Sequence, residues 1–416
     1  MKKTALTLTL VFALLISLMI IVQSAESSSK TIVVPDDYPT IQEAIDSASA
    51  GDTVFVKNGV YTEKIRIDKS LSLIGEDRQN TVVIGVTTRF SASYAVRVTA
   101  EDVTISGFTI KDDHTGDRKI GIWVDTENYQ FQPSRCRIIG NNIENNRIEG
   151  IVIQSGENHV ISENNITRNK KGISVGSSNN VISGNNIRGN NALGVSVVSS
   201  TNVTISENNI SGNGVTPSYG ETNPGGLNLR SYGSFFVYGN NITDNQGFGV
   251  QFAEGCSNSL VYQNNILRNG IGVKLLNFPL GGDSTIGTGN IVYLNNIVDN
   301  SQQAFVERGW SGNSEQGNGT DVVAWDNSEE GNYWSDYLSS YPNAAEVAAS
   351  GIGDTPYVVD ENGVDHYPLM QQVDISTASP PPSTPLSFLT ALIAGAAITL
   401  VVVGVVLLIH FKKRKH

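Results

Sequence analysis

The hexapeptide Asn141-Asn142-Ile143-Glu144-Asn145-Asn146 is the first of seven copies of the pattern Asn-Asn-Ile-x-x-Asn in this chain of 416 residues. The copies begin at Asn141, Asn164, Asn185, Asn208, Asn240, Asn264 and Asn295. Between them lie short runs of alternating apolar residues after a glycine, as in Gly172-Ile173-Ser174-Val175. A repeat of about 22 residues with insertions is typical of a solenoid of stacked units, and the alternation predicts strands. The sequence therefore predicts an all-β fold, a right-handed single-stranded parallel β-helix.

Two sets of residues in the repeat have predictable places in such a coil. The isoleucines from Ile143 to Ile297 should point inward and form a buried column, because side chains alternate between the two faces of a strand. The asparagines should lie at turns, where they tolerate left-handed backbone and bond neighbouring amides. Stacked at equal heights, their amides can also bond one another along the axis. We therefore expect these asparagines to be structural.

The composition divides the chain into six parts. They are a signal peptide (1–25), the β-helix (31–325, with Asn-Asn-Ile coils over 138–300), a C-terminal cap module (326–372), a Pro/Ser linker (373–385), a transmembrane helix (386–411) and a basic cytoplasmic tail (412–416). The first part carries Lys2 and Lys3 before its apolar run, as a signal peptide does, although a run of this length would also suit an uncleaved anchor.

The C-terminal apolar segment predicts the location of the protein. Residues 386–409 are 24 nearly all apolar positions without a formal charge, which suffices to span a bilayer. Four basic residues follow within 412–415, and such a cluster belongs on the cytoplasmic side. We expect a single-pass cell-membrane protein whose β-helix is extracellular or extracytoplasmic.

Charge and cysteine content narrow the set of partners. Without the six basic residues of the two ends, 22 basic side chains face 40 acidic ones, a net charge of −18 that argues against nucleic acid as a partner.

Cys136 and Cys256 fall about five coils apart, roughly 24 Å along the axis, so we expect buried thiols rather than a disulfide. Among the Asn-x-Ser/Thr sites, Asn318 lies in a predicted loop and is the glycosylation candidate. A monomer is expected.

Both ends of the solenoid need cover, because the end strands expose unpaired edges. Thr40, with Glu43 three residues on, predicts the N-cap of a helix over about 40–49 that covers the first coil. At the other end, the stretch Gly331-Asn332-Tyr333-Trp334-Ser335-Asp336-Tyr337 supplies large aromatic side chains for closing the last coil. His366, beside Asp365, is either a ligand or base, or a packed residue.

These ends and repeats together resemble the NosD-type β-helix family, whose PbH1-type coils recur in carbohydrate-binding and sugar-hydrolysing proteins. The resemblance covers residues 31–370. It is carried by residues 39–45, 51–56, 59–61, 73–75, the Asn-Asn-Ile coils and 331–337. The N-terminal block is also similar to pectin methylesterases. For the founding members the family implies a periplasmic role in maturing the copper site of nitrous-oxide reductase.

Copper or calcium is implied by this resemblance alone. Three Met, two Cys and five His without a cluster are a poor supply of soft ligands for copper. Relatives often carry an acidic calcium loop where this chain has residues 343–350, and Glu346 is the one acid there. Calcium takes six or more oxygen ligands. The residues themselves therefore predict no metal site.

Insertions in the repeat indicate a binding surface. Residues 111–120 and 214–225 lengthen the turn before the glycine-containing strand, and residues 125–135 and 277–289 lengthen the turn after it. The outward column of that sheet is predicted to be Trp123, Val152, Ser174, Ser196, Asn228, Gln251 and Lys274. A tryptophan at one end with polar groups along the column suits an extended glycan. The alternative is that tolerated loops surround an ordinary solvated face.

Catalysis would need residues outside this column, since glycoside hydrolysis usually uses two carboxylates about 5–10 Å apart. The candidates are Asp112, His114, Asp117, Asp125 and Arg230. Loop acids can equally be solvated charge. Tyr238, Tyr262 and Tyr293, each two residues before its Asn pair, should stack as a ladder that is either a sugar platform or structural.

The leading functional prediction is therefore a membrane-anchored, extracytoplasmic β-helix protein that binds an extended polysaccharide or glycan, without assured catalysis. One alternative is a polysaccharide lyase or hydrolase acting around Trp123. Others are a NosD-like accessory protein for a copper enzyme and a structural protein of the cell envelope.

Overall fold

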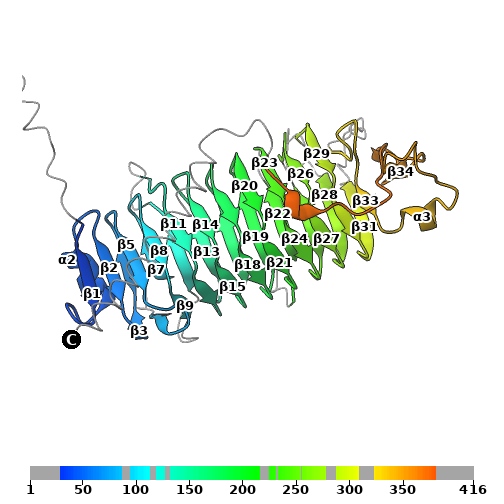
Figure 1. Ribbon diagram of the computed structural model, residues 1–416. Helices are drawn as coiled ribbons and strands as arrows, with labels where there is room; N and C mark the ends of the chain where they lie inside the picture. Colours follow the sequence, from blue (N-terminus) through cyan, green and yellow to red (C-terminus); the bar gives the residue numbers. More distant parts are fainter. Residues whose placement is uncertain are drawn as a thin grey trace, which may run out of the picture.

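The computed structural model describes residues 29–86, 94–112, 119–126, 132–215, 224–230, 233–253, 255–277, 287–308 and 323–380. They wind into one elongated solenoid whose coils follow the chain from β1 to β33 (Figure 1). Three parallel sheets of 12, 11 and 10 strands form its walls, with one strand per coil in each. The predicted parallel β-helix is thus confirmed.

We call the three walls sheets A, B and C. Sheet A contains β1 (Thr31–Val34), β2 (Thr53–Val56), β5 (Ser72–Gly75), β8 (Thr104–Ser106), β11 (Arg137–Ile139), β14 (Val160–Ser162), β17 (Val181–Ser183), β20 (Val203–Ser206), β23 (Phe235–Tyr238), β26 (Leu260–Tyr262), β29 (Asn290–Tyr293) and β32 (Val323–Ala324). Sheet B contains β3 (Gly59–Glu63), β6 (Thr81–Gly85), β9 (Thr109–Asp112), β12 (Asn142–Glu144), β15 (Asn165–Thr167), β18 (Asn186–Arg188), β21 (Asn209–Ser211), β24 (Asn241–Thr243), β27 (Asn265–Leu267), β30 (Asn296–Val298) and β33 (Tyr333–Trp334). Sheet C contains β4 (Ile65–Ile67), β7 (Tyr94–Val98), β10 (Ile120–Val124), β13 (Glu149–Ile153), β16 (Lys171–Val175), β19 (Leu193–Val198), β22 (Gly225–Arg230), β25 (Phe248–Phe252), β28 (Ile271–Asn277) and β31 (Gln302–Arg308).

The remaining elements are short. They are α2 (Ile41–Ser47), α3 (Tyr337–Ser340), the antiparallel pair β34 (Tyr357–Val358) and β35 (Val364–Asp365), and a single 3₁₀ turn, η1 (Ile375–Thr377). Within the described ranges, no helix combines the length and apolarity needed to cross a bilayer. The predicted signal peptide (1–25) and transmembrane helix (386–411) lie outside those ranges, as does Asn318.

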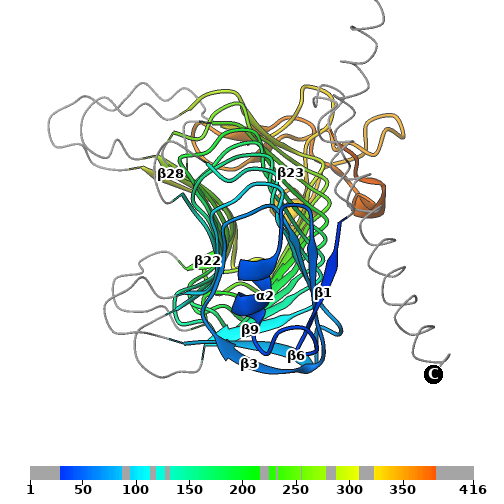
Figure 2. The same cartoon turned by 90° about the vertical axis from the view of Figure 1, so that its left-hand side faces the viewer.

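The isoleucine column is formed as predicted. Each isoleucine of the Asn-Asn-Ile pattern pairs with its counterpart in the next coil, from Ile143 with Ile166 to Ile266 with Ile297. All seven side chains are fully buried. Burying one such side chain contributes roughly 1.5–3 kcal/mol of transfer free energy. This column is one side of the core that the three sheets enclose (Figure 2).

The asparagines form two buried ladders, one at each corner that flanks sheet B. In the first ladder, the side-chain Oδ1 of Asn164 accepts both the backbone N–H and the Nδ2–H of Asn141, at 3.0 and 3.1 Å. The same pair of hydrogen bonds to the asparagine of the next coil recurs up to Asn332, with donor–acceptor distances of 2.9–3.2 Å. The second ladder runs in the same way from Asn146 to Asn300. The predicted structural role is confirmed.

Left-handed backbone occurs one residue earlier than we expected. It is found at the residue before each ladder asparagine from Asn141 to Asn300, for example at Glu163 before Asn164 (φ 58°) and at Arg168 before Asn169 (φ 56°). The left-handed residue turns the chain at the corner, and the asparagine that follows then points its amide inward. Asparagine is therefore selected here for its hydrogen-bonding groups rather than for its backbone preference.

The glycine at the second position of each repeated strand of sheet C is required by the second ladder. A Cβ atom at Gly150 would lie 2.8 Å from the carbonyl oxygen of Gly172 and 3.0 Å from Nδ2 of Asn169. The neighbouring coil therefore leaves no room for a side chain. The glycine and the asparagine of the repeat are therefore needed together, because the asparagine amide packs against the glycine backbone.

Helix α2 lies across the N-terminal end of the solenoid (Figure 2). Thr40 is its N-cap, as predicted, since its hydroxyl accepts the N–H of Glu43 at 3.2 Å. The carboxylate of Glu63 accepts the next two free N–H groups, those of Ile41 and Gln42, at 3.0 Å each. The apolar face of the helix is fully buried against the first strands.

The C-terminal end continues the solenoid further than predicted. Strand β33 pairs with β30, so that Trp334 lies beside Ile297. The boundary that we expected after residue 325 therefore falls inside the last coil. The Trp334 ring stacks on Tyr357 with ring centroids 4.2 Å apart and an interplanar angle of 7°.

A buried carboxylate organises this end. The Asp365 side chain is fully buried and accepts the N–H of Asn332 at 2.7 Å, the indole N–H of Trp334 at 2.8 Å and the N–H of Tyr367 at 3.0 Å. Gly331 makes room for it, because a Cβ atom there would lie 1.7 Å from Asp365 Oδ1. Loss of solvent on burial raises the pKa of Asp365 to about 6.

The ladder gives a first prediction. In Asn185→Ala, the backbone N–H and Nδ2–H of Asn164 lose their acceptor inside the protein. We expect the free energy of unfolding to fall by roughly 1–3 kcal/mol per group left unsatisfied, measured by guanidinium denaturation. The matched control is Asn186→Ala in the same coil, because Asn186 is only part-buried and bonds Asn165 and Asn209 at the solvent-facing side. Equal losses in the two variants would contradict the structural role of the ladder.

The C-terminal carboxylate gives a second prediction. Between about pH 4 and pH 6, Asp365 is protonated in the folded state, whereas the same carboxyl group is ionised in the unfolded state, because folding raises its pKa. Stability should therefore fall as pH rises through this window, by up to about 3 kcal/mol from this group. The slope should be smaller in Asp365→Asn, measured as the unfolding free energy at pH 4, 5, 6 and 7. Parallel curves for the two proteins would contradict the assignment.

Candidate ligand-binding cleft at Trp123

The predicted outward column of sheet C is present in register. Trp123 pairs with Val152, and the column continues through Ser174, Ser196, Asn228, Gln251 and Lys274. It begins two coils earlier than predicted, at Arg66 followed by Arg97, and ends at Phe305. The sequence pattern therefore identified which side chains share this face.

Three of the seven predicted positions are closed, which corrects the expectation of an open channel along the whole sheet. Ser196, Gln251 and Lys274 are 6%, 3% and 8% exposed. Gln251 donates to Asn228 Oδ1 at 2.9 Å, and Lys274 Nζ lies 2.7 Å from Glu307 Oε2. The side chains thus bond to one another rather than facing solvent.

A cleft of ≈ 820 Å³ opens at the Trp123 end, along the corner where the strands of sheet C turn toward sheet A. It is lined by Trp123, Asp125, Thr126, Gln132, Ser134, Gln154, Ser155, Gly156, Glu157, Gly176, Ser177, Ser178 and Ser199. The lining is rich in hydroxyl, amide and carboxylate groups around one indole. Four successive coils contribute to it, so the cleft extends about 14 Å along the axis.

The Trp123 side chain is held from three sides. Its indole N–H donates to Gln154 Oε1 at 3.0 Å, one coil further along. The guanidinium carbon of Arg97 lies 4.9 Å from the ring centroid, and the Tyr94 ring meets the indole edge-on at 6.2 Å. The cation over the ring and the fixed N–H set the orientation of the indole before any ligand arrives.

The two carboxylates in the cleft both have partners. Asp125 Oδ2 lies 3.0 Å from a terminal nitrogen of Arg97, which also donates to the carbonyl of Thr126 at 3.2 Å. The Asp125 side chain is 11% exposed. Glu157 accepts from Nδ2 of Asn179 at 2.8 Å. Arg97 therefore links the ring of Trp123 to the carboxylate of Asp125.

The other predicted catalytic residues do not join this cleft. Asp112 is buried, with one carboxylate oxygen 2.9 Å from Nζ of Lys119 and the other 3.0 Å from Nε of Arg147. Its surroundings are those of an internal ion cluster, which corrects the placement of Asp112 on a loop wall. Arg230 is exposed at the end of β22. His114 and Asp117 lie outside the described residues. Of the candidates that the structure describes, Asp125 alone lines the cleft.

Most of the cleft lining escaped the sequence analysis. Gln154, Ser155 and Glu157 follow β13, while Ser177, Ser178 and Ser199 follow the next two strands of sheet C. A signal for them exists, since Ser-Gly, Gly-Ser-Ser and Ser-Ser follow three successive Gly-containing strands. This signal is weaker than the alternation of the strands, because serine and glycine are common in any turn.

The tyrosine ladder is stacked but not open. Tyr262 lies between Tyr238 and Tyr293 with ring centroids 5.3 Å apart on each side. Tyr238 and Tyr262 are only 1% and 3% exposed, and burial raises the pKa of Tyr238 to about 12. Ala378 packs against the same cluster. This burial corrects the idea of a free sugar platform, because the chain's own C-terminal segment covers it.

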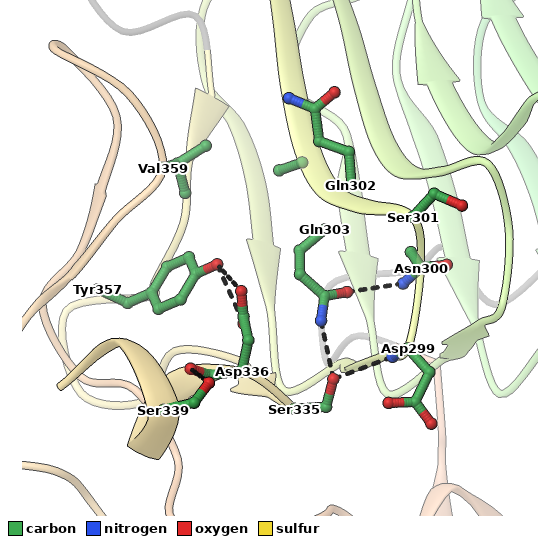
Figure 3. A pocket seen from close by; sticks show the side chains of 11 residues that line it. Asp299, Asn300, Ser301, Gln302, Gln303, Ser335, Asp336, Ser339, Tyr357 and Val359 are labelled. Atoms are coloured by element: carbon green, nitrogen blue, oxygen red, sulfur yellow. Dashed lines mark hydrogen bonds between the residues drawn. The ribbon is translucent and has the colours of Figure 1, made fainter. Parts of the chain in front are cut away.

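A second cavity of ≈ 550 Å³ lies where the last coil meets the C-terminal module (Figure 3). Its polar groups are bonded to one another. Gln303 donates to Ser335 Oγ at 2.8 Å and accepts from Asn300 at 3.0 Å, while Tyr357 donates to the carboxylate of Asp336 at 3.1 Å. We regard this cavity as a structural joint and place the functional candidate at Trp123.

The described residues do not fit a copper ion. No group of three or more His, Cys, Asp or Glu side chains within the described ranges could hold a metal. Cys136 and Cys256 are free and buried, as predicted, and burial raises the pKa of each to about 12. Burial lowers the pKa of His159 to about 4, and this ring bonds the backbone on both sides. His366 is exposed beside Asp326.

Two family models match this chain. "Right handed beta helix region" matches residues 72–223, and "Periplasmic copper-binding protein (NosD)" matches residues 218–339. Together with the three parallel sheets, they confirm the resemblance to the NosD-type β-helix family.

Similarity to individual proteins is more limited. Pectinesterase A of Dickeya dadantii is 32% identical over 108 residues, which are 22% of this chain and 28% of that protein. This chain thus spans less than a third of that curated relative. Pectate lyase Pel9A superposes with a TM-score of 0.48 and 16% identity, over 72% of this chain and 81% of that chain. The Dettilon tailspike protein gives a TM-score of 0.47 and 14% identity, over 71% of this chain and 61% of that chain.

Proposed function

We propose, from the confirmed resemblance to the NosD-type β-helix family, that this chain binds an extended polysaccharide or glycan in the cleft at Trp123. The cleft itself is the observation that carries the proposal. A sugar ring offers an apolar face that packs on an aromatic ring and a rim of hydroxyls that need hydrogen-bond partners. The cleft supplies one oriented indole with serine, glutamine and carboxylate groups around it.

The shape of the cleft supports a polymer rather than a single sugar. Its lining repeats from coil to coil, since Ser155, Ser177 and Ser199 each stand two residues after matched positions of successive strands of sheet C. A ligand with its own repeat can therefore meet similar groups at each step along the axis. The partial identity to Pectinesterase A, a protein named for its action on pectin, points to the same class of ligand.

Binding without turnover is favoured over catalysis. Asp125 is paired with Arg97 and its side chain is only 11% exposed, so it is not presented to a ligand as a free carboxylate. The second carboxylate, Glu157, is exposed and bonded to Asn179. The arrangement orients Arg97 over Trp123 rather than presenting a free acid and base.

The protein is proposed to act at the outer face of a membrane. The support is in the sequence: residues 386–409 are apolar and uncharged, and the basic residues 412–415 follow them. This arrangement would hold the β-helix on the extracytoplasmic side, with the C-terminus in the cytoplasm.

A glycan array of the full-length protein in detergent micelles tests the proposed cleft. Trp123→Ala should weaken binding about tenfold or more, since an aromatic contact contributes roughly 0.5–1.5 kcal/mol beyond its buried area. The matched control is Phe305→Ala, because Phe305 belongs to the same outward column, is 36% exposed and lies outside the cleft. Equal binding by the wild type and Trp123→Ala would remove the cleft as the binding site.

The match to the NosD family model over residues 218–339 favours a second candidate, an accessory role in copper-enzyme maturation. This role predicts that the purified full-length protein retains copper in a fixed ratio. Elemental analysis of protein that has been exposed to copper and desalted measures this ratio. Less than one tenth of an equivalent would exclude a stable copper site.

A further inference from the structure

The last described segment, residues 373–380, does not extend freely from the C-terminal module. It runs back along the outside of the solenoid, where η1 lies beside the later coils (Figure 1). Asn296 binds the backbone of Val373 twice: its Nδ2–H donates to the carbonyl at 2.8 Å, and its Oδ1 accepts the N–H at 2.7 Å. An asparagine side chain here replaces the backbone of a neighbouring strand.

The contacts continue along sheet A. The hydroxyl of Tyr262 donates to the carbonyl of Ser379 at 2.6 Å. Ala378 packs against the tyrosine ladder and comes within 3.2 Å of where a Cβ atom of Gly239 would be. Asp374 fixes the turn between these contacts by accepting the N–H of Ser376 at 2.9 Å. We call residues 373–379 the strap.

The direction of the strap is defined by its partners. Asn296 belongs to β30, Tyr262 to β26 and Gly239 follows β23, so the strap crosses two coils toward the N-terminal end, about 10 Å along the axis. The chain therefore leaves the solenoid at its side, and it moves away from the C-terminal module as it does so.

One outward column of the face that the strap crosses is largely apolar, while the other carries Ser183 and Ser206 before the tyrosine ladder. Val181, Phe236, Leu260 and Ile291 lie in one register column on the outside of sheet A, with Thr204 between the first two. The equivalent outward column of sheet C is polar between Ser174 and Lys274. Sheets A and C form opposite walls of the solenoid (Figure 2).

Chain length limits how far this face can lie from the anchor. Leu386 begins the apolar segment seven residues after Ser379, and seven residues span at most about 25 Å. The twelve strands of sheet A extend over about 53 Å, and Tyr262 lies about 43 Å from the N-terminal end. A solenoid standing on its N-terminal end would place Tyr262 beyond the reach of the anchor. Standing on the C-terminal module would require the chain to reverse its direction after the strap.

We propose that the strap holds the solenoid side-on to its own membrane, with the outer face of sheet A and its apolar column toward the lipid surface. The inference rests on the proposed membrane anchor. The partner is a lipid bilayer, and the outward column of sheet C then faces away from it. The strap thus determines the orientation of the protein and not only its attachment.

Energy transfer in lipid nanodiscs tests the orientation. A donor is placed at Val60→Cys, near the N-terminal end, or at Leu338→Cys, near the other end, because both positions are exposed (67% and 52%). The acceptors are labelled lipid headgroups. A side-on solenoid gives comparable transfer at the two positions. A standing solenoid separates their heights by most of the roughly 50 Å axis, so transfer would be strong at one end and nearly absent at the other.

The strap itself is tested by Asn296→Ala combined with Tyr262→Phe, which removes its bonds to Val373 and Ser379. We expect faster hydrogen exchange at the amide of Val373 and unequal or broadened transfer at the two ends. Asn241→Ala is the matched control, since Asn241 bonds Asn265 in the same register row and lies away from the strap. An unchanged unfolding midpoint shows that the variants fold.

The possible failures are distinguishable. Full-length protein that is released from liposomes by alkaline carbonate would overturn the proposed anchor, and the side-on orientation with it. Protein that stays inserted but gives unequal transfer in the wild type would overturn the orientation alone. Equal transfer that persists in the double variant would show that the strap does not set the orientation.

Discussion

A parallel β-helix buries backbone N–H groups at the corners of every coil, and each of them needs an acceptor. In this chain the acceptor is the side-chain oxygen of an asparagine one coil further along, which takes the backbone N–H and the amide N–H of the asparagine before it. The bonds are complete only when successive coils stack in register. The glycines of sheet C follow from the same contact, since the amide of the next coil occupies the space of their missing side chains.

This register is what makes a precise site feasible on so simple a scaffold. Trp123 lies beside Arg97 of the previous coil and bonds Gln154 of the next, so three coils must stack correctly to hold one indole. Asp125 is connected to the same group through Arg97. The asparagine ladders at the corners thus set the spacing between successive coils, and the variable turns after sheet C supply the polar lining of the cleft.

The ends of the ladders determine the ends of the protein. The first ladder finishes at Asn332, whose amide donates to the carbonyl of Trp325 at 2.7 Å and whose backbone N–H meets the buried Asp365. The second ladder finishes at Asn300, whose Nδ2–H donates to the side-chain oxygen of Gln303. The side-chain N–H of Gln303 in turn donates to Oγ of Ser335. The aromatic module therefore both covers the last coil and completes its hydrogen bonds. The strap extends this closure back over the tyrosine ladder.

The sequence by itself determined the coil, its inward isoleucines, its asparagine ladders and the outward column of sheet C. These are local patterns, because a period of two assigns each residue to a face and the repeat length sets which residues stack. Only the tertiary structure decided what lies on those faces. Tyr262 is covered by Ser379, 117 residues later in the chain, and Asp112 is neutralised by Lys119 and Arg147 across a corner. Alternation reports that a side chain points outward, but exposure depends on segments that return from a distance, and no local pattern encodes their path.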